Sequence, residues 1–174
     1  GNEKLADQAA VDAMRSTLNA MTIDGTVVIG EGERDEAPML YIGEKVGEGG
    51  PKVDIALDPL EGTTITAKGG ENAMAVIALA QDGGFLNAPD VYMEKISANI
   101  PKEKNIISLQ QDLKSNIREL AKYKNINIED MIICILDRDR HENIIEEVRS
   151  LGSRIKMIGD GDVSAVISSV LPNN

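Results

Sequence analysis

Two carboxylates, Asp58 and Glu61, stand at the end of an apolar segment, residues 53–57. Apolar residues alternate there with polar ones, which predicts a strand with one face in the core and Asp58 at its carboxyl end. Because Pro59 cannot donate to a sheet ladder, we expect the strand to stop there. Asp58, the Leu60 carbonyl and Glu61 would then face one point, and such oxygens suit Mg²⁺ or Mn²⁺. The alternative from these residues is an acidic turn that caps the next helix.

A second acidic segment follows another short β-prone run, residues 26–29, which glycines bound on both sides. Its carboxylates are Glu31, Glu33, Asp35 and Glu36. Confined carboxylates repel one another, so they either fan out into water or are held by a multivalent cation. A solvated loop is the simpler interpretation of this segment alone. Beside a second acidic strand end the metal interpretation gains, because adjacent strand ends can aim both sets of oxygens at one point.

A helix is expected before these segments, because residues 6–21 carry apolar side chains at helical spacing. Asp7 heads the buried face of that helix, where a carboxylate ordinarily caps the helix or interacts with its dipole. After the acidic turn, residues 73–80 predict a buried strand, and a turn at 81–84 predicts a hairpin with the residues that follow. Tyr92 lies in the polar loop beyond, where a tyrosine more often packs than contacts a ligand.

The second half of the chain alternates helices and strands. Helices are expected at 113–123, 142–151 and 163–170, and strands at 131–136 and 154–158. This alternation predicts a βαβ unit with a parallel sheet. The charges and Pro101 in residues 100–105 suggest a connector, so the predicted domains are residues 1–100 and 101–174.

Charged residues follow both strands of the predicted βαβ unit, at the edge where α/β sheets commonly bind ligands. Arg138 and Arg140 follow the first strand, and Asp160 and Asp162 follow the second. The arginines could grip a phosphate or could pair with neighbouring aspartates in a solvated loop. Asp160 and Asp162 could cap the following helix. His141 is interpreted as a surface or capping residue, not as a base.

The composition limits the classes of function. With 174 residues, 42% of them hydrophobic, the chain can bury one good core or one small domain and part of another. A net charge of −11 argues against a nucleic-acid-binding surface. Cys134 is the only cysteine, and no apolar run approaches the roughly 18 residues of a membrane span. We therefore expect a cytoplasmic protein without nucleic-acid or membrane partners.

The string Asp-Pro-Leu-Glu-Gly-Thr at 58–63 resembles the Asp-Pro-Ile-Asp-Gly-Thr signature of the metal-dependent, lithium-sensitive sugar and inositol phosphatases. Glu61, together with the segment 29–40, resembles class II fructose-1,6-bisphosphatase in particular. The resemblance continues through residues 87–95 to the Gly-Asp-Gly-Asp string at 159–162. It implies an α/β fold (α+β layered) with mixed sheets and helices in α-β-α-β-α layers. Residues 1–100 would be the metal-binding phosphatase domain, and residues 101–174 a partial, truncated βαβ domain that binds substrate.

The resemblance also implies an activity, namely metal-dependent hydrolysis of the 1-phosphate of fructose 1,6-bisphosphate, or of sedoheptulose 1,7-bisphosphate, in gluconeogenesis. Two or more Mn²⁺ or Mg²⁺ ions would neutralise the phosphate, and Thr63, bonded to Asp7 or Asp35, would orient the attacking water. The implied metal ligands are Asp7, Glu31, Asp58 and Glu61, with Glu33, Asp35 and Thr63 as catalytic residues. The implied substrate contacts are Gly62, Thr63, Tyr92, Arg138, Arg140, Asp160 and Asp162. A homo-oligomer is expected.

The chain departs from the family pattern at several places. The family usually has Gly-Asp-Lys before the first helix, where this chain has Gly1, Asn2 and Glu3, and more often has Lys at position 138. The family continues with a Gly-rich segment and a further metal-ligating Glu, so we expect a partial chain. Two alternatives remain: an inositol-monophosphatase-like enzyme, which would normally have Asp at position 61, and a non-catalytic metal-binding fragment.

Overall fold

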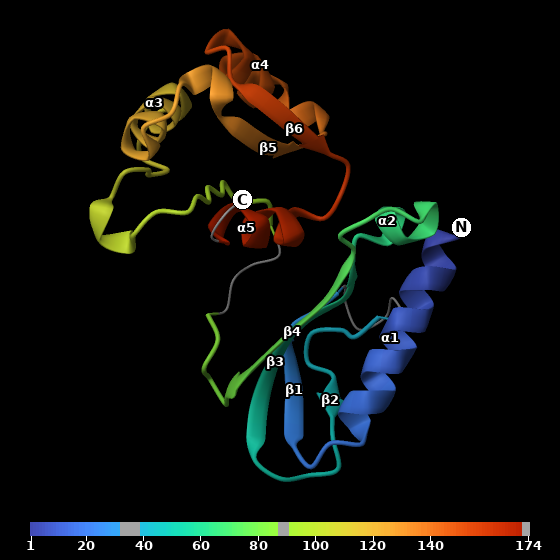
Figure 1. Cartoon of the computed structure of the whole chain (residues 1–174). Helices are drawn as coiled ribbons and strands as arrows, with labels where there is room; N and C mark the ends of the chain where they lie inside the picture. The colour runs from blue at the N-terminus through green and yellow to red at the C-terminus, as the bar shows by residue number, and fades with distance from the viewer. Residues whose placement is uncertain (32–38, 87–90, 172–174) are drawn as a thin grey trace. The chain divides into compact units, whose positions relative to one another are not determined.

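The structure, a computed structural model, describes residues 1–31, 39–86 and 91–171. They form two compact units, Gly1–Val91 (unit 1) and Tyr92–Asn174 (unit 2), shown in Figure 1. Each unit packs helices on a sheet, which confirms the α/β class. The boundary between the two units lies N-terminal to the connector expected near Pro101. The functional division into domains 1–100 and 101–174 stays a prediction.

Unit 1 is built on a mixed four-stranded sheet in the order β2-β1-β3-β4. Its elements are α1 (Glu3–Asn19), β1 (Asp24–Ile29), β2 (Lys45–Val46), β3 (Lys52–Glu61), α2 (Thr63–Lys68) and β4 (Met74–Gln81). The central strands β1 and β3 are parallel, and β2 and β4 are antiparallel to their neighbours. The carboxyl ends of β1 and β3 therefore share one edge of the sheet.

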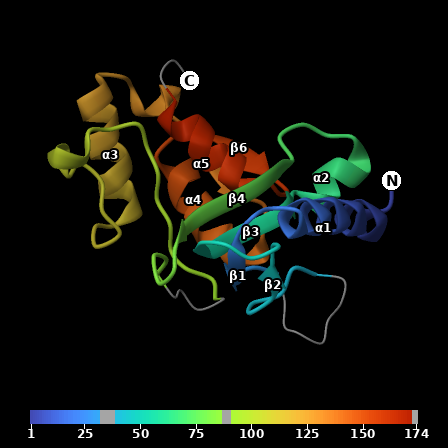
Figure 2. The ribbon, with the colours of Figure 1, turned by 90° about the horizontal axis from the view of Figure 1, so that it is seen from below.

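Helix α1 forms because its apolar side chains recur on one face and because Asn2 caps its first turn. The Asn2 side chain accepts a hydrogen bond from the Leu5 N–H at 3.2 Å. Val11 and Leu18 of the helix join the buried core of the sheet, with Val27 and Ile55 as its centre. The helix runs alongside the sheet in both views of the ribbon (Figures 1 and 2). The packing fixes α1, and with it Asp7, relative to β1 and β3.

Strand β3 does not stop at Pro59, so that expectation was wrong. The strand continues to Glu61, and its pairing with β4 shifts register between Asp58, opposite Val76, and Glu61, opposite Met74. Proline is tolerated at such an irregularity because no ladder hydrogen bond is required from it there. The acidic turn predicted from sequence is thus the irregular end of a paired strand.

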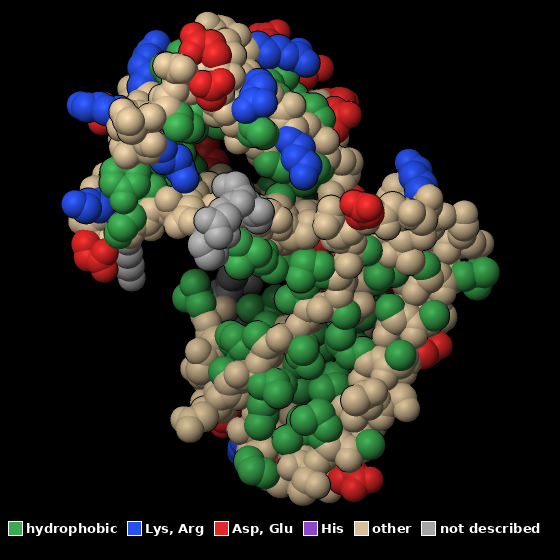
Figure 3. Space-filling view, viewed as in Figure 1, with side chains coloured by type: hydrophobic (Ala, Val, Ile, Leu, Met, Phe, Trp, Pro, Cys, Tyr) green, Lys and Arg blue, Asp and Glu red, His purple; other side chains and the backbone are tan. Residues whose placement is uncertain are grey.

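Strand β4 was expected to be buried, and that expectation was also wrong. It is an edge strand, and Ile77 and Leu79 are 45% and 49% exposed. Hydrophobic side chains gather over this sheet in Figure 3. The turn after β4 forms, with the Gly83 N–H bonded to Asp54 Oδ2 at 2.7 Å. No strand follows it in residues 85–86, and the antiparallel partner of β4 is β3.

Unit 2 contains the predicted βαβ arrangement. Its elements are η1 (Lys102–Lys104), α3 (Leu113–Lys124), η2 (Ile128–Asp130), β5 (Ile132–Leu136), η3 (Asp139–His141), α4 (Glu142–Ser150), β6 (Arg154–Ile158) and α5 (Asp162–Val170). Strands β5 and β6 are parallel, and α4 connects them. Ile117, Ile135 and Val148 are among the buried side chains of the core that joins α3, α4 and β5. Among the described residues, none of the helices combines the length and apolar composition needed to cross a bilayer.

Candidate active site

Glu31, which follows β1, interacts with two other carboxylates of unit 1, Asp58 of β3 and Asp7 of α1, and we refer to these three residues as the acidic cluster. Parallel pairing, with Ile29 opposite Ala56, places Glu31 beside the end of β3. Burial raises the pKa of Glu31 to about 7, with further contributions from the charges of Asp58 and Asp7 and from a hydrogen bond with Asp58. The predicted meeting of two acidic strand ends is therefore present.

The remaining oxygens of this region are held by the irregular end of β3. Asp58 Oδ1 accepts a hydrogen bond from the Leu60 N–H at 3.0 Å. Glu61 is only 6% exposed. Oε2 of Glu31 is fully buried and has no hydrogen-bond partner among the residues the structure describes. A buried carboxylate oxygen without a donor is costly unless a proton or a cation compensates it.

The chemistry of these donors fits a hard divalent cation, which prefers carboxylate oxygens. Their positions do not form a closed metal site. Within residues 1–31, 39–86 and 91–171, no group of three or more His, Cys, Asp and Glu side chains is arranged to hold a metal ion. The predicted catalytic residues Glu33 and Asp35 lie outside the described residues.

Gly62 and Thr63 connect the acidic end of β3 to α2. Gly62 has φ of 101°, a left-handed conformation that favours glycine, and a Cβ there would lie 3.2 Å from the Ile65 side chain. Thr63 is the first residue of α2 and is half-buried. The Thr63 hydroxyl therefore follows the acidic end of β3 two residues after Glu61.

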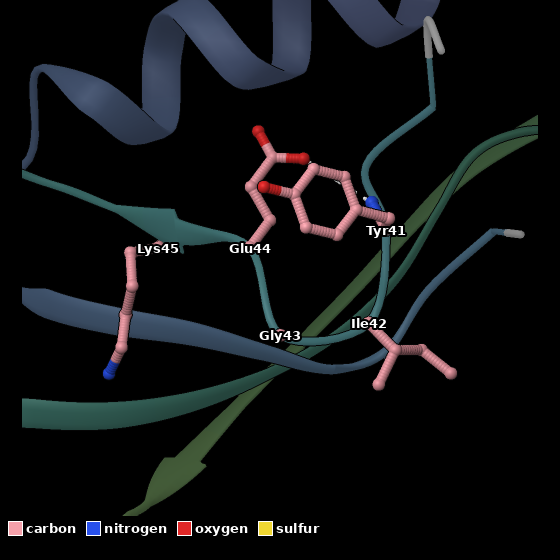
Figure 4. A pocket seen from close by; sticks show the side chains of 5 residues that line it. All are labelled: Tyr41, Ile42, Gly43, Glu44 and Lys45. Carbon is pink, nitrogen blue, oxygen red and sulfur yellow. Dashed lines mark hydrogen bonds between the residues drawn. The ribbon is translucent and has the colours of Figure 1, made fainter. Parts of the chain in front are cut away.

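A partly buried ion pair in unit 1, between Arg15 and Glu44, was not predicted from the sequence. Arg15 Nε lies 2.6 Å from Glu44 Oε1, and this hydrogen bond raises the pKa of Arg15 above its usual value. Glu44 borders a pocket of about 450 Å³ lined by Tyr41, Ile42, Gly43, Glu44 and Lys45 (Figure 4). The sequence carried a signal for the pair, because Arg15 shares a helical face with Val11 and Leu18 and thus requires a buried partner.

Unit 2 brings several predicted substrate contacts together. The guanidinium carbon of Arg140 lies 4.1 Å from the centre of the Tyr92 ring. Tyr92 is 85% exposed, so it is not a packing residue. Arg138 donates to the Asp137 carbonyl at 2.9 Å. The contacts described for these two arginines do not include the Asp137 or Asp139 carboxylates, so the solvated ion-pair alternative is not what the structure shows.

The aspartates after β6 lie at the start of α5. Asp162 is the first residue of the helix, and its carboxylate pairs with Lys95 at 3.2 Å. Asp160 is half-buried in the preceding loop. His141 Nδ1 forms a hydrogen bond of 2.8 Å with the Leu136 carbonyl, in agreement with a structural role. The predicted substrate residues Tyr92, Arg138, Arg140, Asp160 and Asp162 thus belong to unit 2, and the predicted metal ligands to unit 1.

The fold places the chain among α/β proteins, and polar side chains follow the carboxyl ends of its parallel strands, where such proteins commonly bind ligands. The family model described as "Bacterial fructose-1,6-bisphosphatase, glpX-encoded" matches residues 1–174, and the chain belongs to this family. It is 51% identical over 175 residues to fructose-1,6-bisphosphatase 1 class 2 of Escherichia coli (strain K12), covering 100% of this chain and 52% of the relative.

Another relative comes from Prochlorococcus marinus (strain NATL1A) and is named D-fructose 1,6-bisphosphatase class 2/sedoheptulose 1,7-bisphosphatase. The identity is 48% over 169 residues, which cover 97% of this chain and 50% of the relative. The chain therefore spans about half the length of the curated relatives it matches.

Proposed function

We propose that this chain forms part of a metal-dependent phosphatase that hydrolyses the 1-phosphate of fructose 1,6-bisphosphate. The observation that carries the proposal is the acidic cluster at the ends of β1 and β3, in a chain of the fructose-1,6-bisphosphatase family. Clustered carboxylates attract a divalent cation, and a divalent cation can assist phosphoryl transfer to water by neutralising charge and activating the water.

Asp7, Glu31, Asp58 and Glu61 would hold two or more Mg²⁺ or Mn²⁺ ions. When bound, the ions supply charge neutralisation at the phosphoryl group and lower the pKa of a bound water. Glu31 must give up its proton to act as a ligand, because its pKa is about 7 in the metal-free protein. Of the remaining predicted ligands, Asp58 and Glu61 lie at the end of β3 and Asp7 lies on α1.

Thr63 would orient the attacking water, with Asp7 or Asp35 as the partner of its hydroxyl. Its place directly after the acidic end of β3 supports this role, because a water-positioning group must lie beside the phosphoryl site. Glu33 and Asp35 are proposed to complete the catalytic group from the sequence resemblance alone.

Tyr92, Arg138 and Arg140 of unit 2 would bind the phosphate that is not cleaved. Stacking of Arg140 on the Tyr92 ring occupies the face of the guanidinium and leaves N–H groups along its edge for phosphate oxygens. Asp160 and Asp162 would accept hydrogen bonds from sugar hydroxyls. Arginine at position 138, where the family more often has lysine, retains the positive charge that the clamp needs.

The names of the relatives favour two substrates, fructose 1,6-bisphosphate and sedoheptulose 1,7-bisphosphate. An inositol-monophosphatase-like activity is the less favoured alternative, because Glu61 and the family match both differ from that pattern. A cytoplasmic location and a homo-oligomer stay predictions.

A phosphate-release assay tests the proposal. The complete protein that contains this chain, and residues 1–174 alone, are incubated with fructose 1,6-bisphosphate, sedoheptulose 1,7-bisphosphate and inositol 1-phosphate, with Mg²⁺ or Mn²⁺. We expect release from a sugar bisphosphate by the complete protein, loss of release with a chelator, and little release by residues 1–174 alone. Cleavage of inositol 1-phosphate in preference to both sugars, or no cleavage at all, would contradict the proposal.

A further inference from the structure

Arg15 connects helix α1 to the segment formed by residues 39–44, which precedes β2. Two nitrogens of its guanidinium contact both oxygens of Glu44, Nε with Oε1 at 2.6 Å and Nη2 with Oε2 at 3.1 Å. Nη2 also donates to the Met39 carbonyl at 2.5 Å. Glu44 is 9% exposed and the Arg15 side chain is 27% exposed, so this pair is partly buried. A guanidinium can make all three contacts at once, and a lysine ammonium lacks the fork that makes the bidentate pair.

The segment that Arg15 grips is bonded directly to Glu31. The Glu31 N–H donates to the carbonyl of Leu40, the residue after Met39, at 3.1 Å. Leu40 is fully buried in the core of unit 1. A Cβ on Gly30 would lie 2.4 Å from the same carbonyl, which shows how closely the two backbones approach. A shift of Leu40 would therefore move the backbone of Glu31.

The same segment is also tied to the sheet. The Val27 N–H donates to the Glu44 carbonyl at 3.0 Å, and the Gly43 N–H donates to the Val27 carbonyl at 2.7 Å. Oε2 of Glu44 accepts a further hydrogen bond from the Tyr41 N–H at 3.3 Å. The backbone bonds hold residues 41–44 on β1, and the Arg15 contacts hold residues 39 and 44 on α1, the helix that also carries Asp7.

We propose that Arg15 is a positioning residue of the acidic cluster. It fixes Met39 and Leu40, and through them the backbone of Glu31, relative to the helix that presents Asp7. The contribution of Arg15 to metal binding rests on the proposed function, but its positioning of the Glu31 backbone does not. Arg15 itself touches neither metal nor substrate in this account.

Variants of the complete protein can separate this role from general stabilisation. Arg15→Met removes every contact, and Arg15→Lys keeps the charge without the bidentate pair. Lys45→Met is the matched control. Lys45 directly follows Glu44 in the chain, and its ion pair with Asp24, at 3.8 Å, is exposed. Val46→Ala is the control for stability, since Val46 is buried opposite Gly25, at the other end of β1 from Glu31.

The first measurement is amide hydrogen exchange in the metal-free protein. We expect the Glu31 amide to exchange at least about 10-fold faster in Arg15→Met, while Lys45→Met leaves it unchanged. Val46→Ala should lower the unfolding midpoint without a selective effect on Glu31. Unchanged protection of the Glu31 amide in Arg15→Met, or equal acceleration in Val46→Ala, would overturn the inference.

The second measurement is Mn²⁺ affinity by calorimetry, at a temperature where every variant is folded. We expect about 10-fold weaker binding in Arg15→Met, partial recovery in Arg15→Lys and no change in either control. Faster exchange at Glu31 with unaltered Mn²⁺ affinity would overturn the link to the metal site. If the unaltered protein binds no Mn²⁺, the proposed function fails, and the exchange result alone decides for or against positioning of Glu31 by Arg15.

Discussion

Units 1 and 2 each contain a pair of parallel strands, and polar side chains follow the carboxyl ends of both pairs. In unit 1 these side chains are carboxylates, and burial, followed by the charges of Asp58 and Asp7, raises the pKa of Glu31. In unit 2 they include two arginines, and the contacts of Tyr92 and Lys95 are exposed. The strand ends of unit 1 thus carry carboxylates, whereas those of unit 2 carry arginines as well as aspartates.

The two pairs of parallel strands also differ in the number of strands that flank them and in the burial of their side chains. In unit 1 the parallel strands are flanked by β2 and β4, and Val27 and Ile55 are fully buried. In unit 2 the described sheet has two strands only. Interactions in the partly buried, better supported region resist solvent screening. Substitutions in unit 1 should therefore have the larger effects on binding.

The largest effect is expected for Asp58→Asn, which removes a charge from the acidic cluster and keeps the shape of the turn. Mn²⁺ affinity in the complete protein should fall by about 100-fold or more, beyond the losses caused by residues that only orient a ligand. Calorimetric titration is the measurement. Asp24→Asn, at the opposite end of β1, removes the same charge and serves as control; equal losses in both variants would argue for a general charge effect.

Arg140→Ala tests the proposed phosphate contact of unit 2. We expect KM for the sugar bisphosphate to rise about 10-fold with kcat changed less than about 2-fold, because a remote phosphate contact contributes uniform binding. Steady-state kinetics give both constants. Arg149→Ala removes an exposed arginine from α4 of the same unit and should change neither. A fall in kcat with constant KM would move Arg140 to the reacting phosphate.

Glu31→Gln gives a smaller, pH-dependent effect on the metal-free protein. The pKa of Glu31 is about 7 when folded and 4.5 in its ordinary state, so the folded protein keeps a proton that the unfolded chain releases. The contribution of Glu31 to stability is therefore complete below pH 4.5 and is lost as the pH rises through 7. Solvent screening limits this loss to about 1 kcal/mol.

Urea unfolding at about pH 5 and about pH 8 measures this loss of stability. Glu31→Gln should abolish the part of the stability difference between the two pH values that Glu31 causes. Mn²⁺ should offset the loss in the unaltered protein, since a bound cation replaces the proton. An equal pH dependence in the variant and the unaltered protein would show that Glu31 is not the titrating group.

The smallest effect is expected for Lys95→Met. Lys95 is 68% exposed in its pair with Asp162, and such pairs contribute less than about 0.5 kcal/mol. The unfolding midpoint should hardly move. A loss of stability comparable to that of a core substitution would show that the contacts at the strand ends of unit 2 are as strongly supported as those of unit 1.

Local sequence patterns predicted the elements well, since the spacing of apolar residues marked α1, β5 and α4 and the alternation at 53–58 marked the first part of β3. The meeting of Glu31 and Asp58 was also predictable, because adjacent strands end at one edge. The pair of Arg15 with Glu44 was missed because its partners are far apart in sequence. The end of β3 was wrongly expected at Pro59, because the irregular pairing that accommodates this proline depends on β4. Ile77 and Leu79 were wrongly expected to be buried, because apolar composition alone does not distinguish an edge strand.

The continuation of β3 through Pro59 has a consequence for the timescale of events at the acidic end. Asp58 and Glu61 belong to a paired strand, with partners Val76 and Met74 on β4. Loops move within nanoseconds to microseconds, whereas a paired strand separates by slower local unfolding. The lifetime of a bound cation should then be set by the breaking of its own bonds and not by opening of the chain. Mn²⁺ release faster than exchange of the Glu61 amide would agree with this order of events, and release at the same rate or slower would contradict it.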